Sequence, residues 1–111
     1  MKGIQCHDGK LYTEMRLKFQ GKVHTTERML IDTSSPSSII SHELAEKLGM
    51  DPQTYEKTET MDSISVGPLK VSEFPLGISS INEDGVIGVD FLMKVGAKIN
   101  LDSMTISSSR T

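Results

Sequence analysis

The sequence has little of what would identify several common classes of protein at once. A single cysteine, Cys6, excludes a disulfide within the chain, and the aromatic residues are two tyrosines and three phenylalanines, with no tryptophan. The 12 lysines and arginines are outnumbered by 15 aspartates and glutamates, which gives a formal net charge of −3. This balance provides no basic surface, so we expect neither a nucleic acid nor an anionic membrane as a partner.

Apolar runs of the length of a membrane span are also missing, and the first ten residues, MKGIQCHDGK, lack the apolar stretch of a signal peptide. With only one cysteine, a reducing compartment is the natural location, and we expect a soluble, cytoplasmic protein. The 111 residues are enough for one domain, residues 1–111, with a core from about residue 10 to residue 106 and frayed ends.

The residues that are present favour a thin, mostly β core. Hydrophobic residues make up 36% of the chain, and seven methionines supply packing volume that aromatic residues do not. Period-two alternation predicts a strand over residues 10–20, and Gly21 is then the tip of a β-hairpin whose second strand leads to residue 32. Further short strands are expected around a turn at 67–68, at 85–87, and over 97–107 with a turn at 101–104.

One or two short helices complete the expected secondary structure. Ser41 is a suitable N-cap for the segment HELAEKLG, and Gly49 suits the position after the end of that helix. A second helix is expected to have Asp90 as its N-cap and to end at Gly96. The polar residues 51–63 are expected to form an exposed loop or a weak hairpin.

The segment MLIDTSSPSSIIS, residues 29–41, places a carboxylate at the end of an otherwise apolar strand. Asp, Ser and Thr are ordinary turn residues after a strand, so Asp32 could be only a turn residue. Two features indicate more: the residues before Asp32 are uniformly apolar, and the chain is apolar again at Ile39 and Ile40, so we expect the turn to be enclosed. An enclosed carboxylate must be hydrogen-bonded, paired with a charge or shifted in its pKa.

This segment resembles the active-site loop of the retropepsin-like aspartic proteases, in which apolar residues lead into Asp-Thr-Gly or Asp-Ser-Gly. A second stretch, GVIGVDFLMKVGAKINLDSMTI at residues 85–106, resembles the second signature of the same family, in which two apolar residues and a glycine precede a helix and a closing strand. The matching residues are Val86, Ile87 and Gly88, in a loop that would support the site. The resemblance covers about residues 10–106 and implies a single-lobe acid-protease β-barrel.

The resemblance also implies a reaction and an assembly. Aspartic proteases need two carboxylates that share one proton, one acting as general base on a water and the other polarising the scissile carbonyl. The chain has room for one lobe, so the resemblance implies a C2 homodimer with Asp32 of each subunit near the axis. It places Thr33, Ser34 and Ser35 in the active-site loop at the dimer contact, and it implies a peptide or an unfolded protein as substrate.

The sequence departs from the family pattern in two places. Ser34 stands where the family has glycine, and its side chain would clash across the twofold axis, force an unfavourable φ, or donate to a carboxylate and lower its pKa. Between Gly49 and Gly67 the chain has no glycine and is short for the flap that closes the cleft in this family. Tyr55 is either a flap-like aromatic residue or a surface tyrosine. A reduced flap would leave the cleft open to water.

Other chemistries have weaker support. The three histidines, His7, His24 and His42, show no metal-ligand spacing, so we expect no metal and no cofactor. SSPSS lacks the flanking glycines of a nucleophile elbow, and no glycine loop for phosphate is present. Asp62 and Asp102 have polar or turn-like surroundings, and we expect turn residues there rather than a second catalytic carboxylate.

Three hypotheses follow from these observations. The favoured one is a homodimeric aspartic endopeptidase that uses Asp32 of each subunit. The second is a retropepsin-like dimer that binds a peptide or only itself, with catalysis impaired by Ser34 and the short flap. The third is an unrelated small β domain in which Asp32 is a turn residue. The mass in solution separates the third hypothesis from the other two, because only those two require a dimer.

Overall fold

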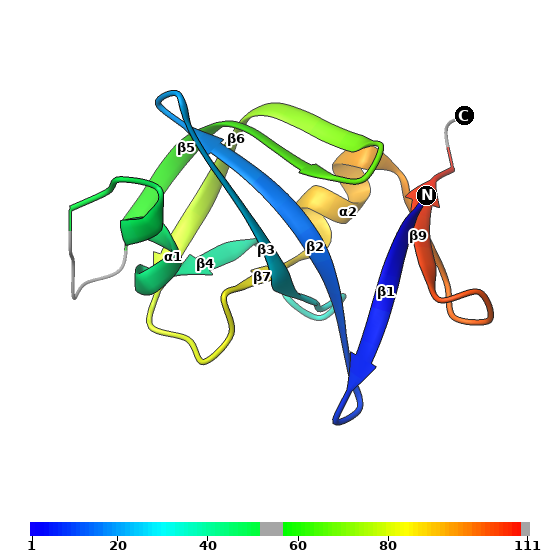
Figure 1. Ribbon diagram of the computed structural model, residues 1–111. Coiled ribbons are helices and arrows are strands. Elements are labelled where there is room, and N and C mark those ends of the chain that lie inside the picture. Colours follow the sequence, from blue (N-terminus) through cyan, green and yellow to red (C-terminus); the bar gives the residue numbers. More distant parts are fainter. Residues whose placement is uncertain (52–56, 110–111) are drawn as a thin grey trace.

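The computed structural model describes residues 1–51 and 57–109 of the chain (Figure 1). Tyr55, the flap-like residue of the sequence analysis, lies outside the described residues. Six strands close into a barrel, because the sixth pairs back onto the first. In order around the barrel they are β2 (Lys10–Phe19), β3 (Lys22–Ile31), β7 (Gly85–Ile87), β4 (Ile39–Ser41), β6 (Leu69–Ser79) and β5 (Lys57–Val66). The expected mostly β barrel is confirmed.

Three more strands extend the sheet beyond the barrel. β1 (Lys2–His7) pairs with the first half of β2, β9 (Thr105–Ser108) pairs with β1, and β8 (Ala97–Asn100) pairs with β9. The first and the last strand therefore lie side by side (Figure 1). Frayed ends were expected outside a core of about residues 10–106, and β1 was not among the predicted strands. Ile4 is the only buried residue of β1, so the strand carries no alternating pattern that could reveal it.

The first helix, α1 (His42–Lys47), is confirmed with its caps. The Leu44 N–H donates to the Ser41 hydroxyl at 3.0 Å, which makes Ser41 the N-cap, and Gly49 follows the helix end with a φ of +86°. Leu44 and Leu48 turn inward and are buried. The helix is thereby fixed against the barrel directly after β4.

The second helix, α2 (Val89–Val95), is also confirmed, but its predicted N-cap is wrong. Gly88 occupies the N-cap position, and Asp90 lies in the first turn. The Asp90 carboxylate accepts two hydrogen bonds from a serine of another loop, and its Oδ1 also accepts the Phe91 N–H at 2.7 Å, so Asp90 joins the first turn of the helix to that loop. The helix ends at Gly96, which has the left-handed conformation with φ +61°.

The hairpin of β5 and β6 turns at Gly67 and Pro68 as expected, but β5 begins earlier than predicted. Residues 57–63, expected to be a loop or a weak hairpin, pair with β6 as part of a ten-residue strand. Asp62 is therefore a strand residue and not a turn residue; its carboxylate accepts the Gly21 N–H at the tip of the β2–β3 hairpin, at 3.1 Å. Asp102 lies in the exposed turn at 101–104, as predicted.

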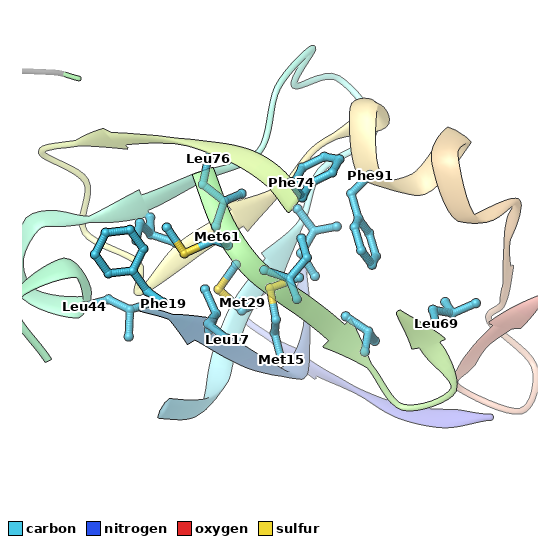
Figure 2. Packing of buried hydrophobic residues seen from close by; sticks show 14 of the residues in the cluster. Met15, Leu17, Phe19, Met29, Leu44, Met61, Leu69, Phe74, Leu76 and Phe91 are labelled. Atoms are coloured by element: carbon cyan, nitrogen blue, oxygen red, sulfur yellow. The ribbon is translucent and has the colours of Figure 1, made fainter. Parts of the chain in front are cut away.

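The core depends on methionine, as the composition indicated. Met15, Met29 and Met61 are fully buried inside the barrel, where they pack among leucine and isoleucine side chains (Figure 2). Phe91 of α2 meets Phe74 of β6 edge to face, with ring centroids 5.9 Å apart. The helix after the second motif is thus anchored in the core. Within the described residues, no helix has the length and apolar character needed to cross a bilayer.

Candidate active site

Asp32 is positioned by two neighbouring parallel strands. β3 and β7 pair in parallel, with Met29 opposite Gly85 and Ile31 opposite Ile87. The ladder is extended by one bond, because the Asp32 N–H donates to the Ile87 carbonyl at 3.0 Å. The first residue after the apolar strand is therefore fixed to the second motif by a backbone hydrogen bond.

The chain after Asp32 forms a tight turn. The Ser35 N–H donates to the Asp32 carbonyl at 3.2 Å, so Thr33 and Ser34 are the central residues of a four-residue turn. Both central residues are exposed, and Asp32 is half-buried. The expectation of an enclosed turn is wrong for the single chain, because no other element of the described residues covers this turn.

The carboxylate of Asp32 is bound at one oxygen only. Oδ1 accepts the Ser34 hydroxyl at 2.5 Å and the Ser34 N–H at 2.9 Å. These two bonds, the hydroxyl first, hold the pKa of Asp32 below its ordinary value, against a smaller opposing effect of burial. In the described part of the chain, Oδ2 accepts no hydrogen bond.

Ser34 is accommodated without backbone strain. Four residues other than glycine have a positive φ in the described chain, and Ser34 is not among them. The unfavourable φ considered for this position is therefore excluded. Of the consequences considered for a serine in place of glycine, the structure shows the donation to a carboxylate.

The far end of the loop is held by a second aspartate. The Ser38 hydroxyl donates to Oδ1 of Asp90 at 2.7 Å, and the Ser38 N–H donates to Oδ2 at 3.0 Å. The Gly88 N–H in turn donates to the Ser38 hydroxyl oxygen at 2.9 Å, and Ser38 is 1% exposed. This contact was not predicted from the sequence. The available signal was an aspartate two residues after the glycine of the second motif, in a helix that follows a serine-rich loop.

Gly88 is required by close packing rather than by an unusual backbone conformation. A Cβ on Gly88 would lie 2.7 Å from the carbonyl oxygens of Ser35 and Ser37. The Val89 N–H donates to the Ser35 carbonyl at 2.9 Å, so the two motifs touch through their backbones. Val86 and Ile87, which lead to this glycine, are buried. The second motif therefore supports the loop by packing its backbone against the backbone of the loop. Within the described residues, it places no further ionisable group beside Asp32.

The structure brings one carboxylate to this turn. Asp62 is bound to the tip of the β2–β3 hairpin, and Asp102 lies in the turn between β8 and β9. Within residues 1–51 and 57–109, no three His, Cys, Asp or Glu side chains are grouped closely enough to hold a metal ion. A single half-exposed carboxylate with one free oxygen can accept or donate a proton, but it cannot by itself share a proton between two acids.

Comparisons with known proteins agree with this geometry. The model of a family described as aspartyl protease matches residues 15–91, which include Asp32 and the start of the second motif. The chain therefore belongs to the aspartyl protease family. No curated protein sequence matches the chain significantly.

Two crystal structures have a similar fold. One is a retropepsin-like aspartic protease from Rickettsia conorii, with a TM-score of 0.71 and 17% identity, over 92% of this chain and 84% of that chain. The other is the retroviral protease-like domain of Ddi1 from Leishmania major, with a TM-score of 0.69 and 16% identity, over 90% of each chain. The resemblance inferred from the two sequence motifs is confirmed.

Proposed function

We propose that the protein is a homodimeric aspartic endopeptidase that hydrolyses peptide bonds with Asp32 of each subunit. The observation that carries this proposal is the position of Asp32, directly after β3 on a loop that the second motif fixes. Among the described residues, one of its carboxylate oxygens has no hydrogen-bond partner. The family membership supports the reaction class. The substrate we propose is a peptide or an unfolded protein segment, and the proposed location is the cytoplasm.

The need for a dimer follows from the chemistry. In the proposed site two like charges lie close together, so the pair holds one proton over a range of pH. The ionised Asp32 takes a proton from a water, whose oxygen bonds to the scissile carbonyl carbon. The protonated Asp32 gives its proton to the carbonyl oxygen, which yields a tetrahedral diol. When the diol collapses, the C–N bond breaks and a proton passes to the leaving amine.

The exposed turn is suited to such an interface. Thr33 and Ser34 project from the turn into solvent, at the tip of a loop whose other end is buried at Ser38. A twofold axis close to these tips would bring the two Asp32 side chains together and would cover both turns. Thr33 is then the residue placed to bond with the partner's loop.

The impaired dimer stays as a second candidate because of one observation. The Ser34 hydroxyl binds the carboxylate that must act as a base, and a lowered pKa weakens a base. In that case the dimer binds a peptide, or only itself, without cleaving it.

Cleavage of a denatured protein between about pH 4 and pH 7 tests both candidates. We expect cleavage by the wild type and about a 10²–10⁴-fold loss in Asp32→Asn, since a general acid–base group contributes about that much. Asp102→Asn, an aspartate of an exposed turn, is the matched control. A wild type without activity that gains it in Ser34→Gly supports the impaired dimer. A monomeric mass together with no cleavage by any variant contradicts both candidates.

A further inference from the structure

We infer that Ser34 is a positioning residue for Asp32: its hydroxyl occupies Oδ1, keeps the carboxylate ionised, and moves the working range of the proposed pair toward acid. The part about the pH range of activity rests on the proposed function. The effect of Ser34 on the ionisation of Asp32 does not, because it is a property of the single chain. It concerns a residue that the family pattern does not supply, since the family has glycine at this position.

The geometry separates what glycine would do from what serine adds. The Ser34 N–H donates to Oδ1 of Asp32 at 2.9 Å, and a glycine at this position would retain that bond. The hydroxyl bond of 2.5 Å to the same oxygen is the addition. A hydroxyl donor to a carboxylate forms a charge-assisted bond, which weakens when the acid is protonated because the acceptor loses its charge. The added bond therefore favours the ionised form.

The two donors also make the carboxylate asymmetric. Both bind Oδ1, and in the described chain Oδ2 has no hydrogen-bond partner. A proton on Oδ1 would displace at least one of the two donors, so the shared proton of the pair is directed to Oδ2. In a C2 dimer the same selection applies in both subunits, because both contain Ser34.

The direction of the pH effect follows from these bonds. They hold the pKa of Asp32 below its ordinary value, and the first cause is the Ser34 hydroxyl. The pair is active while it holds one proton, which is the range between its two macroscopic pKa values. Because each subunit lowers the pKa of its own carboxylate, both limits of that range lie at lower pH than they would with glycine.

The test compares three variants of Ser34 by NMR titration of the Asp32 carboxyl carbon, with Asp32→Asn used to assign the signal. Ser34→Ala removes the hydroxyl and keeps Cβ, Ser34→Gly removes both, and Ser34→Thr keeps a hydroxyl. We expect the Asp32 midpoint to move to higher pH in the alanine and glycine variants and to stay near the wild-type value in the threonine variant. Ser35→Ala is the matched control, since its hydroxyl binds the Ser37 carbonyl rather than a carboxylate.

The pH profile of cleavage provides the second measurement. We expect the bell-shaped profile of Ser34→Ala to move to higher pH as a whole, so that the ratio of activity near pH 6 to activity near pH 4 rises severalfold. Ser35→Ala should leave the position of the profile unchanged, whatever its effect on the rate.

The possible outcomes separate this inference from the proposed function. An Asp32 midpoint that is the same in wild type and Ser34→Ala overturns the inference, and cleavage by the wild type would still support the peptidase. A midpoint that moves as expected in a protein that cleaves nothing supports the role of the hydroxyl and contradicts the peptidase. A moved midpoint with an unmoved cleavage profile overturns the claim that Ser34 sets the working range.

Discussion

Two aspartate–serine pairs hold the two ends of the same loop, and they differ in almost every respect. At the exposed end, Ser34 lies two residues after Asp32, and both of its donors bind one oxygen of the carboxylate. At the buried end, Ser38 and Asp90 lie 52 residues apart in sequence, and each carboxylate oxygen accepts one donor from the serine. The first pair leaves an oxygen free in a half-buried position, and the second uses both oxygens to join a loop to a helix.

The difference indicates which aspartate performs chemistry and which one builds the site. A carboxylate with both oxygens occupied by donors of a buried residue is a structural contact, because any change in its protonation breaks a bond. A carboxylate with a free oxygen in a solvent-accessible turn can gain and lose a proton without rearranging the fold. Activity should therefore depend on the Asp32 pair, and stability on the Asp90 pair.

Asp90→Ala should produce the largest change in stability. It leaves the hydroxyl and the N–H of the buried Ser38 without their acceptor, which costs about 2–6 kcal/mol at about 1–3 kcal/mol for each stranded group. Asp90→Asn keeps one acceptor oxygen, so it should lose less stability than Asp90→Ala. Denaturant unfolding measures both changes, with Asp102→Ala in an exposed turn as the matched control. Equal stabilities of Asp90→Ala and Asp102→Ala would show that the hydrogen bonds between Ser38 and Asp90 do not stabilise the fold.

Gly88→Ala should cause the second-largest loss of stability, and it should affect both ends of the loop. The added Cβ would lie 2.7 Å from the Ser35 and Ser37 carbonyl oxygens, so the loop must shift, at a cost of about 1–3 kcal/mol. Because that shift reaches Asp32 through Ser35, cleavage should fall as well.

Gly3→Ala is the control for this substitution, since no described residue other than its two chain neighbours has an atom within 4 Å of a Cβ at Gly3. Thermal unfolding and the cleavage rate of the two alanine variants are the measurements. A Gly88→Ala protein with wild-type stability and activity would contradict the close packing of the two motifs.

Asp62→Ala should have the smallest effect on the free energy of unfolding, and the sign of its pH dependence follows from the pKa of Asp62. The N–H groups of Gly21 and Gln20, with a smaller effect of Lys18, hold the pKa of Asp62 below its ordinary value. A depressed pKa stabilises the folded state at neutral pH, and this contribution disappears as the pH falls through the folded-state pKa. The stability difference between wild type and Asp62→Ala should therefore be present at pH 7 and should narrow in acid. A difference that is constant with pH would show that these bonds do not depend on the charge.

Much of the barrel and the first half of the site could be predicted from local patterns. The alternation of apolar and polar residues predicted β2, and the turn glycines predicted the hairpins. The carboxylate of Asp32 directly after an apolar strand indicated the active-site loop. The missed features depend on tertiary contacts: Asp90 has the spacing of an ordinary helix cap, and its partner Ser38 is far away in sequence. In the same way, β1 is recognisable as a strand only once β2 and β9 are beside it.

The central claim about this protein is that catalysis needs two Asp32 side chains, one from each of two chains. The direct measurement is cleavage by wild-type and Asp32→Asn chains that are unfolded and refolded together, at constant total concentration and varied proportion. Activity should fall as the square of the wild-type fraction, to about one quarter in an equal mixture, because only wild-type dimers hold both acids. A linear fall, to about one half in the equal mixture, would mean that each chain acts alone and would contradict the shared site.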